Sequence, residues 1–124
     1  GYVRYVDDFL LFGDDKAQLR EWRVAIIEQL AGLRLTLHEN RAQISPAITG
    51  VPFLGFRVYP THRRLKRRNG LNFQRRFKGL IGQLARREIG LAQLHASVRG
   101  WVNHARYGDT VGLRQAILGR WALA

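Results

Sequence analysis

Two short apolar runs open the chain, at residues 2–5 and 9–12, and two adjacent carboxylates, Asp7 and Asp8, lie between them. Aromatic and aliphatic runs separated by a short polar pair predict a β-hairpin over residues 2–12. Because neighbouring side chains of a strand point to opposite faces, consecutive aspartates can serve one site only where the chain turns. The pattern therefore predicts a turn with two negative charges, which a hard cation such as magnesium would offset.

A helical pattern follows the break at residues 13–15. Apolar residues recur at steps of three and four, which predicts one face of a helix. Asp14 or Asp15 is expected to cap its first turn, with Gln18 completing a capping box to Asp15, and Gly32 is expected to end it. The predicted apolar face consists of Leu19, Trp22, Ile26, Ile27, Leu30 and Leu33.

Extended segments are predicted after this helix. Residues 35–37 alternate as a short strand, Glu39 and Asn40 form a turn, and residues 42–45 resume extended structure. Residues 51–59 are rich in aromatic and β-branched side chains and are predicted to form one further strand. A hairpin, a helix and strands in this order predict an α+β fold.

The second half of the chain has a different composition. Residues 61–69 are predicted to be a basic linker, and three helical patterns follow, with Gly90 and Gly108 between them. We therefore expect a three-helix bundle and a division of the chain into residues 1–59 and 60–124. The three apolar stripes are Phe73, Phe77, Leu80, Ile81 and Leu84, then Leu91, Leu94, Val98, Trp101 and Ala105, then Leu113, Ile117, Leu118 and Trp121.

The net charge of +12 is unevenly distributed over the 124 residues. Residues 1–56 hold six basic and seven acidic side chains, whereas residues 57–124 hold fifteen basic and two acidic ones. So many positive charges repel one another in a compact fold, so a polyanionic partner is expected to neutralise them. Nucleic acid is favoured over a membrane surface as that partner. The residues expected to contact phosphates are Arg63, Arg64, Lys66, Arg67, Arg68, Arg75, Arg76 and Lys78.

Composition also limits the cellular context. No apolar stretch approaches the roughly 20 residues needed to span a bilayer, so no membrane partner is expected. Cysteine is absent, which excludes a disulfide framework and a thiolate zinc site and suits a cytoplasmic protein. Gly1 stands where a methionine would begin a complete chain, and a strand-like run follows at once, so we expect a segment of a longer protein.

The tetrad Tyr5-Val6-Asp7-Asp8 resembles the Tyr-x-Asp-Asp hairpin of reverse transcriptases. Its aromatic and aliphatic flanks favour this reading over a purely polar hairpin turn. The resemblance implies that Asp7 is a direct magnesium ligand and Asp8 its companion, with Tyr5 and Val6 near the primer end and the incoming nucleotide. It also implies two magnesium ions, whose third carboxylate ligand is expected upstream in the same protein.

Further segments follow in the order expected for this family. Arg41 stands where the family has a lysine that is a candidate general acid; because arginine is a poor proton donor, Arg41 is expected to hold charge on the leaving phosphates. A solvated turn arginine is the alternative. Phe53, Leu54 and Gly55 belong to a Phe-Leu-Gly-Phe segment that resembles the primer-grip strand, although a plain core strand is also possible. Residues 99–110 resemble the thumb helices of bacterial reverse transcriptases of the group II intron and diversity-generating retroelement kinds.

The resemblance covers nearly the whole chain and implies the carboxy-terminal part of the palm (residues 1–59) followed by the thumb (residues 60–124) of an RNA-directed DNA polymerase. The implied partners are an RNA template with a DNA primer, deoxynucleotides, and the upstream palm and fingers, in the bacterial cytoplasm. The chain alone is expected to be inactive. Two alternatives stay open: a non-catalytic RNA-binding module, such as a degenerate polymerase or a maturase-like chaperone, and an RNA assembly protein such as a ribosomal component.

Overall fold

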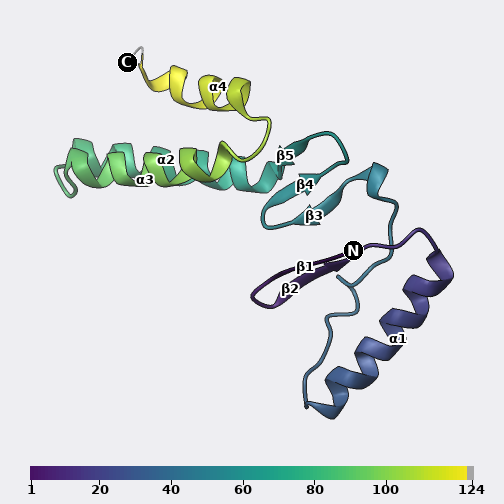
Figure 1. Cartoon of the computed structure of the whole chain (residues 1–124). Coiled ribbons are helices and arrows are strands. Elements are labelled where there is room, and N and C mark those ends of the chain that lie inside the picture. The colour runs from purple at the N-terminus through teal and green to yellow at the C-terminus, as the bar shows by residue number, and fades with distance from the viewer. Residues whose placement is uncertain (123–124) are drawn as a thin grey trace. The chain divides into compact units, whose positions relative to one another are not determined.

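The computed structural model describes residues 1–122 and has an α+β fold with two small antiparallel sheets and four α-helices (Figure 1). It divides into two compact units, Gly1–Pro46 and Ala47–Ala124. The first unit is a β-hairpin with one helix, and the second is a three-stranded sheet with three helices. The α+β prediction is therefore confirmed.

The first unit begins with the predicted hairpin. Strands β1 (Tyr2–Tyr5) and β2 (Asp8–Leu11) pair antiparallel, with Tyr2 opposite Leu11 and Tyr5 opposite Asp8. Gly1 and Phe12 extend the pairing, because each donates a backbone hydrogen bond of 2.8 Å to the carbonyl of the other.

Helix α1 (Lys16–Gly32) follows, and its amino-terminal cap is Asp15, whose carboxylate accepts a 2.8 Å hydrogen bond from the Ala17 amide. Gly32 is the last helical residue, as predicted. The left-handed position that commonly ends a helix is occupied instead by Arg34, at φ 58°. The Arg34 amide donates to the Ala31 carbonyl and the Leu35 amide to the Leu30 carbonyl, which closes the last turn.

The two strands predicted at residues 35–37 and 42–45 are wrong, although the predicted turn at Glu39 and Asn40 is confirmed. A strand needs a neighbour to receive its backbone hydrogen bonds. Within residues 1–122 no segment pairs with either run, and the backbone bonds here are local, such as that from the Ala42 amide to the His38 carbonyl.

The second unit begins with a short 3₁₀ turn, η1 (Ala47–Thr49), and a sheet in the order β3 (Val51–Phe53), β4 (Phe56–Val58), β5 (Arg63–Leu65). The single strand predicted over residues 51–59 is therefore wrong. Leu54 and Gly55 take positive φ values of 46° and 86°, the signature of a two-residue hairpin turn, and fold the run back on itself. The predicted linker at residues 61–69 is also wrong, since it forms β5 and the start of a helix.

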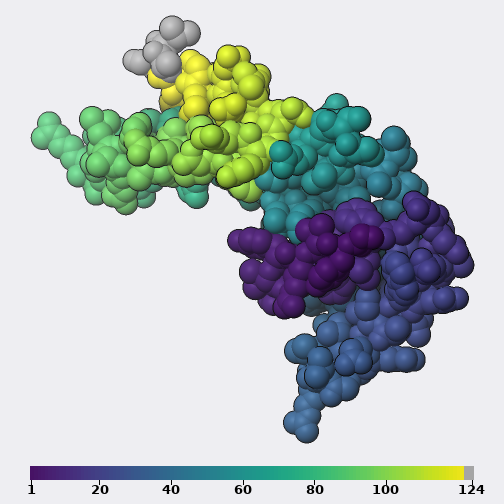
Figure 2. All heavy atoms as spheres, viewed as in Figure 1, coloured from purple at the N-terminus to yellow at the C-terminus, as the bar shows by residue number. Residues whose placement is uncertain are grey.

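Three helices complete the second unit, as predicted: α2 (Arg67–Ala85), α3 (Leu91–Ala105) and α4 (Val111–Ala122). The space-filling view shows their green and yellow side chains in contact (Figure 2). Trp101 stacks on Phe73 with ring centroids 4.0 Å apart and only 4° between the ring planes, and its indole N–H has no partner among the described residues. The core consists of Phe73, Phe77, Trp101, Ala105 and Ile117, surrounded by Leu65, Ile81, Leu94, Val98, Val102 and Leu118.

The loop between α3 and α4 ties the sheet to the helices. The Asp109 amide donates to the Arg63 carbonyl at 2.8 Å, and the Arg63 amide donates back to the Asp109 carboxylate at 3.3 Å. Gly108 lies so close to the sheet that a Cβ there would sit 2.9 Å from Phe56 Cε1. The division predicted between residues 59 and 60 consequently falls inside the second compact unit, because β5 pairs with β4 across it.

Candidate metal hairpin and nucleic-acid interface

The turn of the first hairpin consists of Val6 and Asp7, between the paired residues Tyr5 and Asp8. Val6 has φ 52°, in the left-handed region, where a β-branched residue is an outlier. Two-residue turns with a positive φ at the first position usually have glycine there. Holding valine in this conformation costs about 1–3 kcal/mol, and strain of this kind clusters at functional sites.

The turn gives the two aspartates different backbone positions. Asp7 occupies the second turn position, and Asp8 is the first paired residue of β2, on the strand face shared with Tyr5 and Leu10. Both aspartates are exposed. Arg4 supports the turn, because its Nε donates a 2.8 Å hydrogen bond to the Val6 carbonyl.

Two adjacent carboxylates supply the hard oxygen ligands that magnesium prefers, but they fill only part of its octahedral shell. Across residues 1–122, no group of three or more histidine, aspartate or glutamate side chains is arranged to hold a metal ion. Neither Asp7 nor Asp8 forms an ion pair with another described residue, so both remain available as ligands. Additional ligands would have to come from water, a phosphate or another carboxylate.

Arg41 lies in the turn that follows α1, and it is exposed. Its amide donates to the His38 carbonyl at 2.9 Å, while its guanidinium forms no hydrogen bond or ion pair with any residue the structure describes. It belongs to the same compact unit as Asp7 and Asp8, and it forms no ion pair with either of them. Its expected action on leaving phosphates stays a prediction.

The segment expected near the primer is the tip of the β3–β4 hairpin. The Gly55 carbonyl accepts hydrogen bonds from the Lys66 amide at 3.0 Å and from Asn69 Nδ2 at 3.1 Å. A Cβ on Gly55 would lie 2.5 Å from Asn69 Nδ2, so the missing side chain of this glycine is what lets the Asn69 side chain approach the turn. Leu54 is left 39% exposed at the tip, and Phe53 pairs with Phe56.

Helix α2 turns its basic side chains away from the core. At 100° per residue, Arg68 and Arg75 lie on the face opposite Phe73 and Phe77, which are buried, and Lys78 lies at the edge of that face. Arg76 lies to one side, with its guanidinium carbon 5.8 Å from the Phe73 ring centroid. No acidic residue offsets these charges in the first turn of the helix.

At the carboxy-terminal end of α2, unlike at its start, an acidic side chain pairs with one of the arginines. Arg86 donates hydrogen bonds of 2.5 and 3.1 Å to the two oxygens of Glu88. This bond to the carboxylate raises the pKa of Arg86. Because Arg86 is already paired with Glu88, its charge is less available to a ligand than the charges of Arg68, Arg75 and Lys78, which form no ion pair with any described residue.

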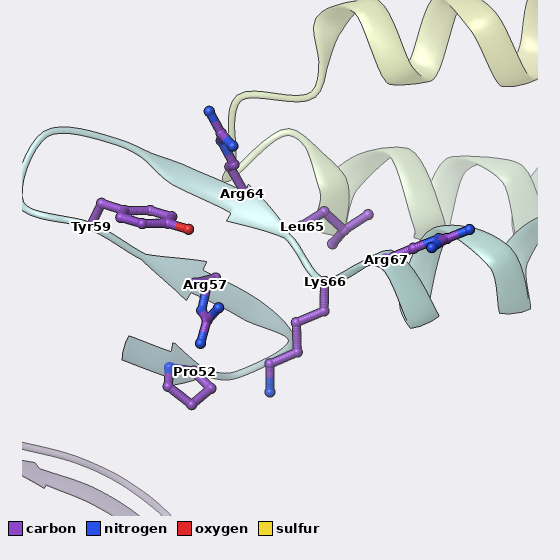
Figure 3. A pocket seen from close by; sticks show the side chains of 7 residues that line it. All are labelled: Pro52, Arg57, Tyr59, Arg64, Leu65, Lys66 and Arg67. Atoms are coloured by element: carbon purple, nitrogen blue, oxygen red, sulfur yellow. The ribbon is translucent and has the colours of Figure 1, made fainter. Parts of the chain in front are cut away.

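The β3–β5 sheet carries a cationic row on one face. Pro52, Arg57 and Arg64 lie directly opposite one another on the three strands. With Tyr59, Leu65, Lys66 and Arg67 they line an open hollow of about 400 Å³ (Figure 3). Strand alternation places Arg63 on the other face of β5, beside the loop that carries Asp109, and so outside this row.

Arg57 was not among the residues expected to contact phosphates. Arg57 belongs to the row only because β4 pairs with β5, whereas the sequence pattern predicts one long strand and a linker for these segments. The signal that could have revealed it is Gly55, since a Leu-Gly pair inside an aromatic run allows a hairpin turn.

No protein-family model and no curated protein matches this chain. Within residues 1–122, none of the helices combines the length and the apolar character required to cross a membrane.

Proposed function

We propose that this chain is the carboxy-terminal part of the palm and the thumb of a bacterial, cytoplasmic reverse transcriptase. The observation that supports it most is the Tyr5–Asp8 hairpin, in which a strained Val6 sets Asp7 in the turn and Asp8 beside it. The reaction would be attack of a primer 3′-hydroxyl on the α-phosphate of a deoxynucleotide. Asp7 and Asp8 would hold magnesium, which supplies charge stabilisation for the attacking and leaving oxygens.

The other residues have positioning roles in this proposal. Arg41 would hold charge on the leaving phosphates, and the Leu54–Gly55 turn would lie near the primer end. Tyr5 and Val6 would lie beside the incoming nucleotide. The basic second unit would hold the RNA/DNA hybrid through its backbone phosphates, which fixes position without reading sequence.

The exposure of the apolar side chains in the first unit supports a larger palm that would cover them. None of the residues in Gly1–Pro46 is buried, and Tyr2, Tyr5 and Phe12 are 59%, 59% and 41% exposed. Aromatic side chains on a short hairpin are normally covered on one face. The remaining palm strands, with the third carboxylate ligand, would cover them in the whole enzyme.

A second candidate is a nucleic-acid-binding module without catalysis. The cationic row and the outer face of α2 favour it, because both lie in the second unit and neither depends on the aspartate hairpin. This candidate predicts binding that is unchanged by Asp7→Asn and no response to deoxynucleotides.

Primer extension separates the two candidates. The longer protein, in which palm and fingers precede this chain, is expected to extend a primed RNA template in the presence of magnesium and to lose that activity with Asp7→Asn. Asp14→Asn is the matched control, because it makes the same chemical change outside the hairpin and leaves the Asp15 cap intact. Equal activity of Asp7→Asn and wild type would refute the catalytic proposal, as would synthesis by residues 1–124 alone.

A further inference from the structure

Arg57 and Arg64 on one face of the β3–β5 sheet and Lys66 and Arg67 at the start of α2 line the same hollow, and we call these four residues the sheet-face row. We propose that the sheet-face row binds successive backbone phosphates of a nucleic-acid strand. This inference rests on the proposed nucleic-acid partner and assigns that partner a specific contact surface, centred on Arg57, in addition to the outer face of α2.

The positive charges of the sheet-face row destabilise the folded chain unless a counter-ion neutralises them. Arg57 and Arg64 are direct cross-strand neighbours, and like charges in that position destabilise a sheet. No acidic side chain lines the hollow, and no ion pair among the described residues involves a member of the row. Lys66 and Arg67 also stand at the positive end of the α2 macrodipole, where anions are favoured and cations are not. Bound phosphates would offset all of these repulsions.

The directions of the side chains point to a polyanion with spaced charges. Arg57 and Lys66 extend toward the β3 side of the sheet, where Pro52 lies, whereas Arg64 extends beyond the outer edge of β5 and Arg67 along α2 (Figure 3). A site for one free phosphate would bring its cations together around a single point. The row instead spreads them over two strands and a helix start, which suits a line of phosphates.

The surroundings hold the row in place and exclude base stacking on it. A Cβ at Gly50 would lie 2.6 Å from Arg57 Cγ and 2.8 Å from the Tyr59 ring, so this glycine packs against both side chains. Tyr59 has His62 stacked on it at 4.4 Å and the Arg64 guanidinium carbon 5.8 Å from its ring centroid. With neighbours against its ring, Tyr59 offers no platform for a base, so the row is expected to bind without sequence preference.

The test measures binding of a fluorescein-labelled RNA/DNA hybrid to the full chain by fluorescence anisotropy over a range of salt concentrations. Each lost phosphate contact lowers the slope of log K against log salt by about 0.9, which corresponds to about eightfold weaker binding at about 0.1 M salt. Arg57→Gln and Lys66→Gln are each expected to show this loss, equally for hybrids of different sequence. Arg99→Gln, an exposed change of equal charge on α3, is the control, and Arg63→Gln tests the opposite face of β5.

Two outcomes would overturn the inference while leaving nucleic-acid binding itself intact. One is an equal, small loss for Arg57→Gln, Lys66→Gln, Arg63→Gln and Arg99→Gln, which would show an effect of net charge alone. The other is efficient competition by inorganic pyrophosphate at constant ionic strength, which would indicate a small-anion site. If the wild-type chain does not bind the hybrid, both the proposed nucleic-acid partner and the proposed role of the sheet-face row are refuted. If primer extension alone fails, the proposed role of the sheet-face row still stands.

Discussion

The contact between Gly55 and Asn69 gives the sharpest stability prediction, because one glycine combines a left-handed backbone with a close neighbour. Gly55 has φ 86°, and an alanine held in this left-handed conformation would cost about 1–2 kcal/mol. Its Cβ would also lie 2.5 Å from Asn69 Nδ2 and 3.3 Å from His104 Nε2, and overpacking of this kind costs about 1–3 kcal/mol. Gly55→Ala is therefore expected to destabilise the second unit by about 2–5 kcal/mol.

The double variant Gly55→Ala/Asn69→Ala separates these two contributions. Asn69→Ala alone removes one hydrogen bond worth about 1 kcal/mol but leaves the Gly55 carbonyl paired with the Lys66 amide, and alanine is the better helix former. We expect it to be nearly neutral. In the double variant the left-handed penalty and the approach to His104 Nε2 remain, so the coupling energy should equal the relieved overpacking against Asn69, about 1–3 kcal/mol.

Urea denaturation followed by circular dichroism measures all four members of this cycle. Gly79→Ala is the matched control, since a Cβ there meets nothing within 4 Å and glycine lies in the interior of α2. It should stabilise by about 0.5–1 kcal/mol. A Gly55→Ala variant as stable as Gly79→Ala, or strictly additive effects in the cycle, would refute the proposed geometry of the hairpin tip.

Three further stability predictions follow from individual contacts. Gly108→Ala should lower the free energy of unfolding by about 1–3 kcal/mol in urea denaturation, because its Cβ would sit 2.9 Å from Phe56 Cε1 and 3.1 Å from the Arg63 carbonyl; an unchanged midpoint would contradict that contact. Asp15→Ala should cost α1 about 1 kcal/mol, seen as about fivefold faster amide hydrogen exchange in the helix, while Asp14→Ala should have little effect. Arg87→Gly should raise the stability of the second unit by up to about 1 kcal/mol, since Arg87 holds the left-handed position after α2 at φ 59°; a fall in stability would mean that its side chain contributes more than its backbone strain costs.

Local sequence patterns identified the elements whose stabilising contacts are close in sequence. The two apolar runs on either side of Asp7 and Asp8 predict the first hairpin, and the pair Asp14 and Asp15 marks the start of α1, where Asp15 is the cap. The apolar stripes after residue 70 include every residue of the buried core cluster. A helical period of 3.6 residues can be seen in the sequence without knowing which element the helix packs against.

The β3–β5 sheet was missed because strand pairing is a non-local property. Residues 51–59 form an unbroken aromatic and branched run, and only Gly55 signals that the chain reverses inside it. The basic composition of residues 63–65 predicts a linker, yet these residues form β5, the third strand of the sheet. The same limit applies to the sheet-face row, since the alignment of Arg57 with Arg64 depends on a register that the sequence does not display.

The central physical claim is that Asp7 and Asp8 together bind divalent cations at the hairpin tip. Titration of the isotope-labelled chain with Mn²⁺, a paramagnetic substitute for Mg²⁺, tests it through line broadening of individual amide signals. We expect broadening first at Val6, Asp7, Asp8 and Phe9, its loss in Asp7→Asn, its persistence in Asp14→Asn, and competition by Mg²⁺. Broadening that begins at Asp14 and Asp15 instead, or that is unchanged in Asp7→Asn, would contradict the claim.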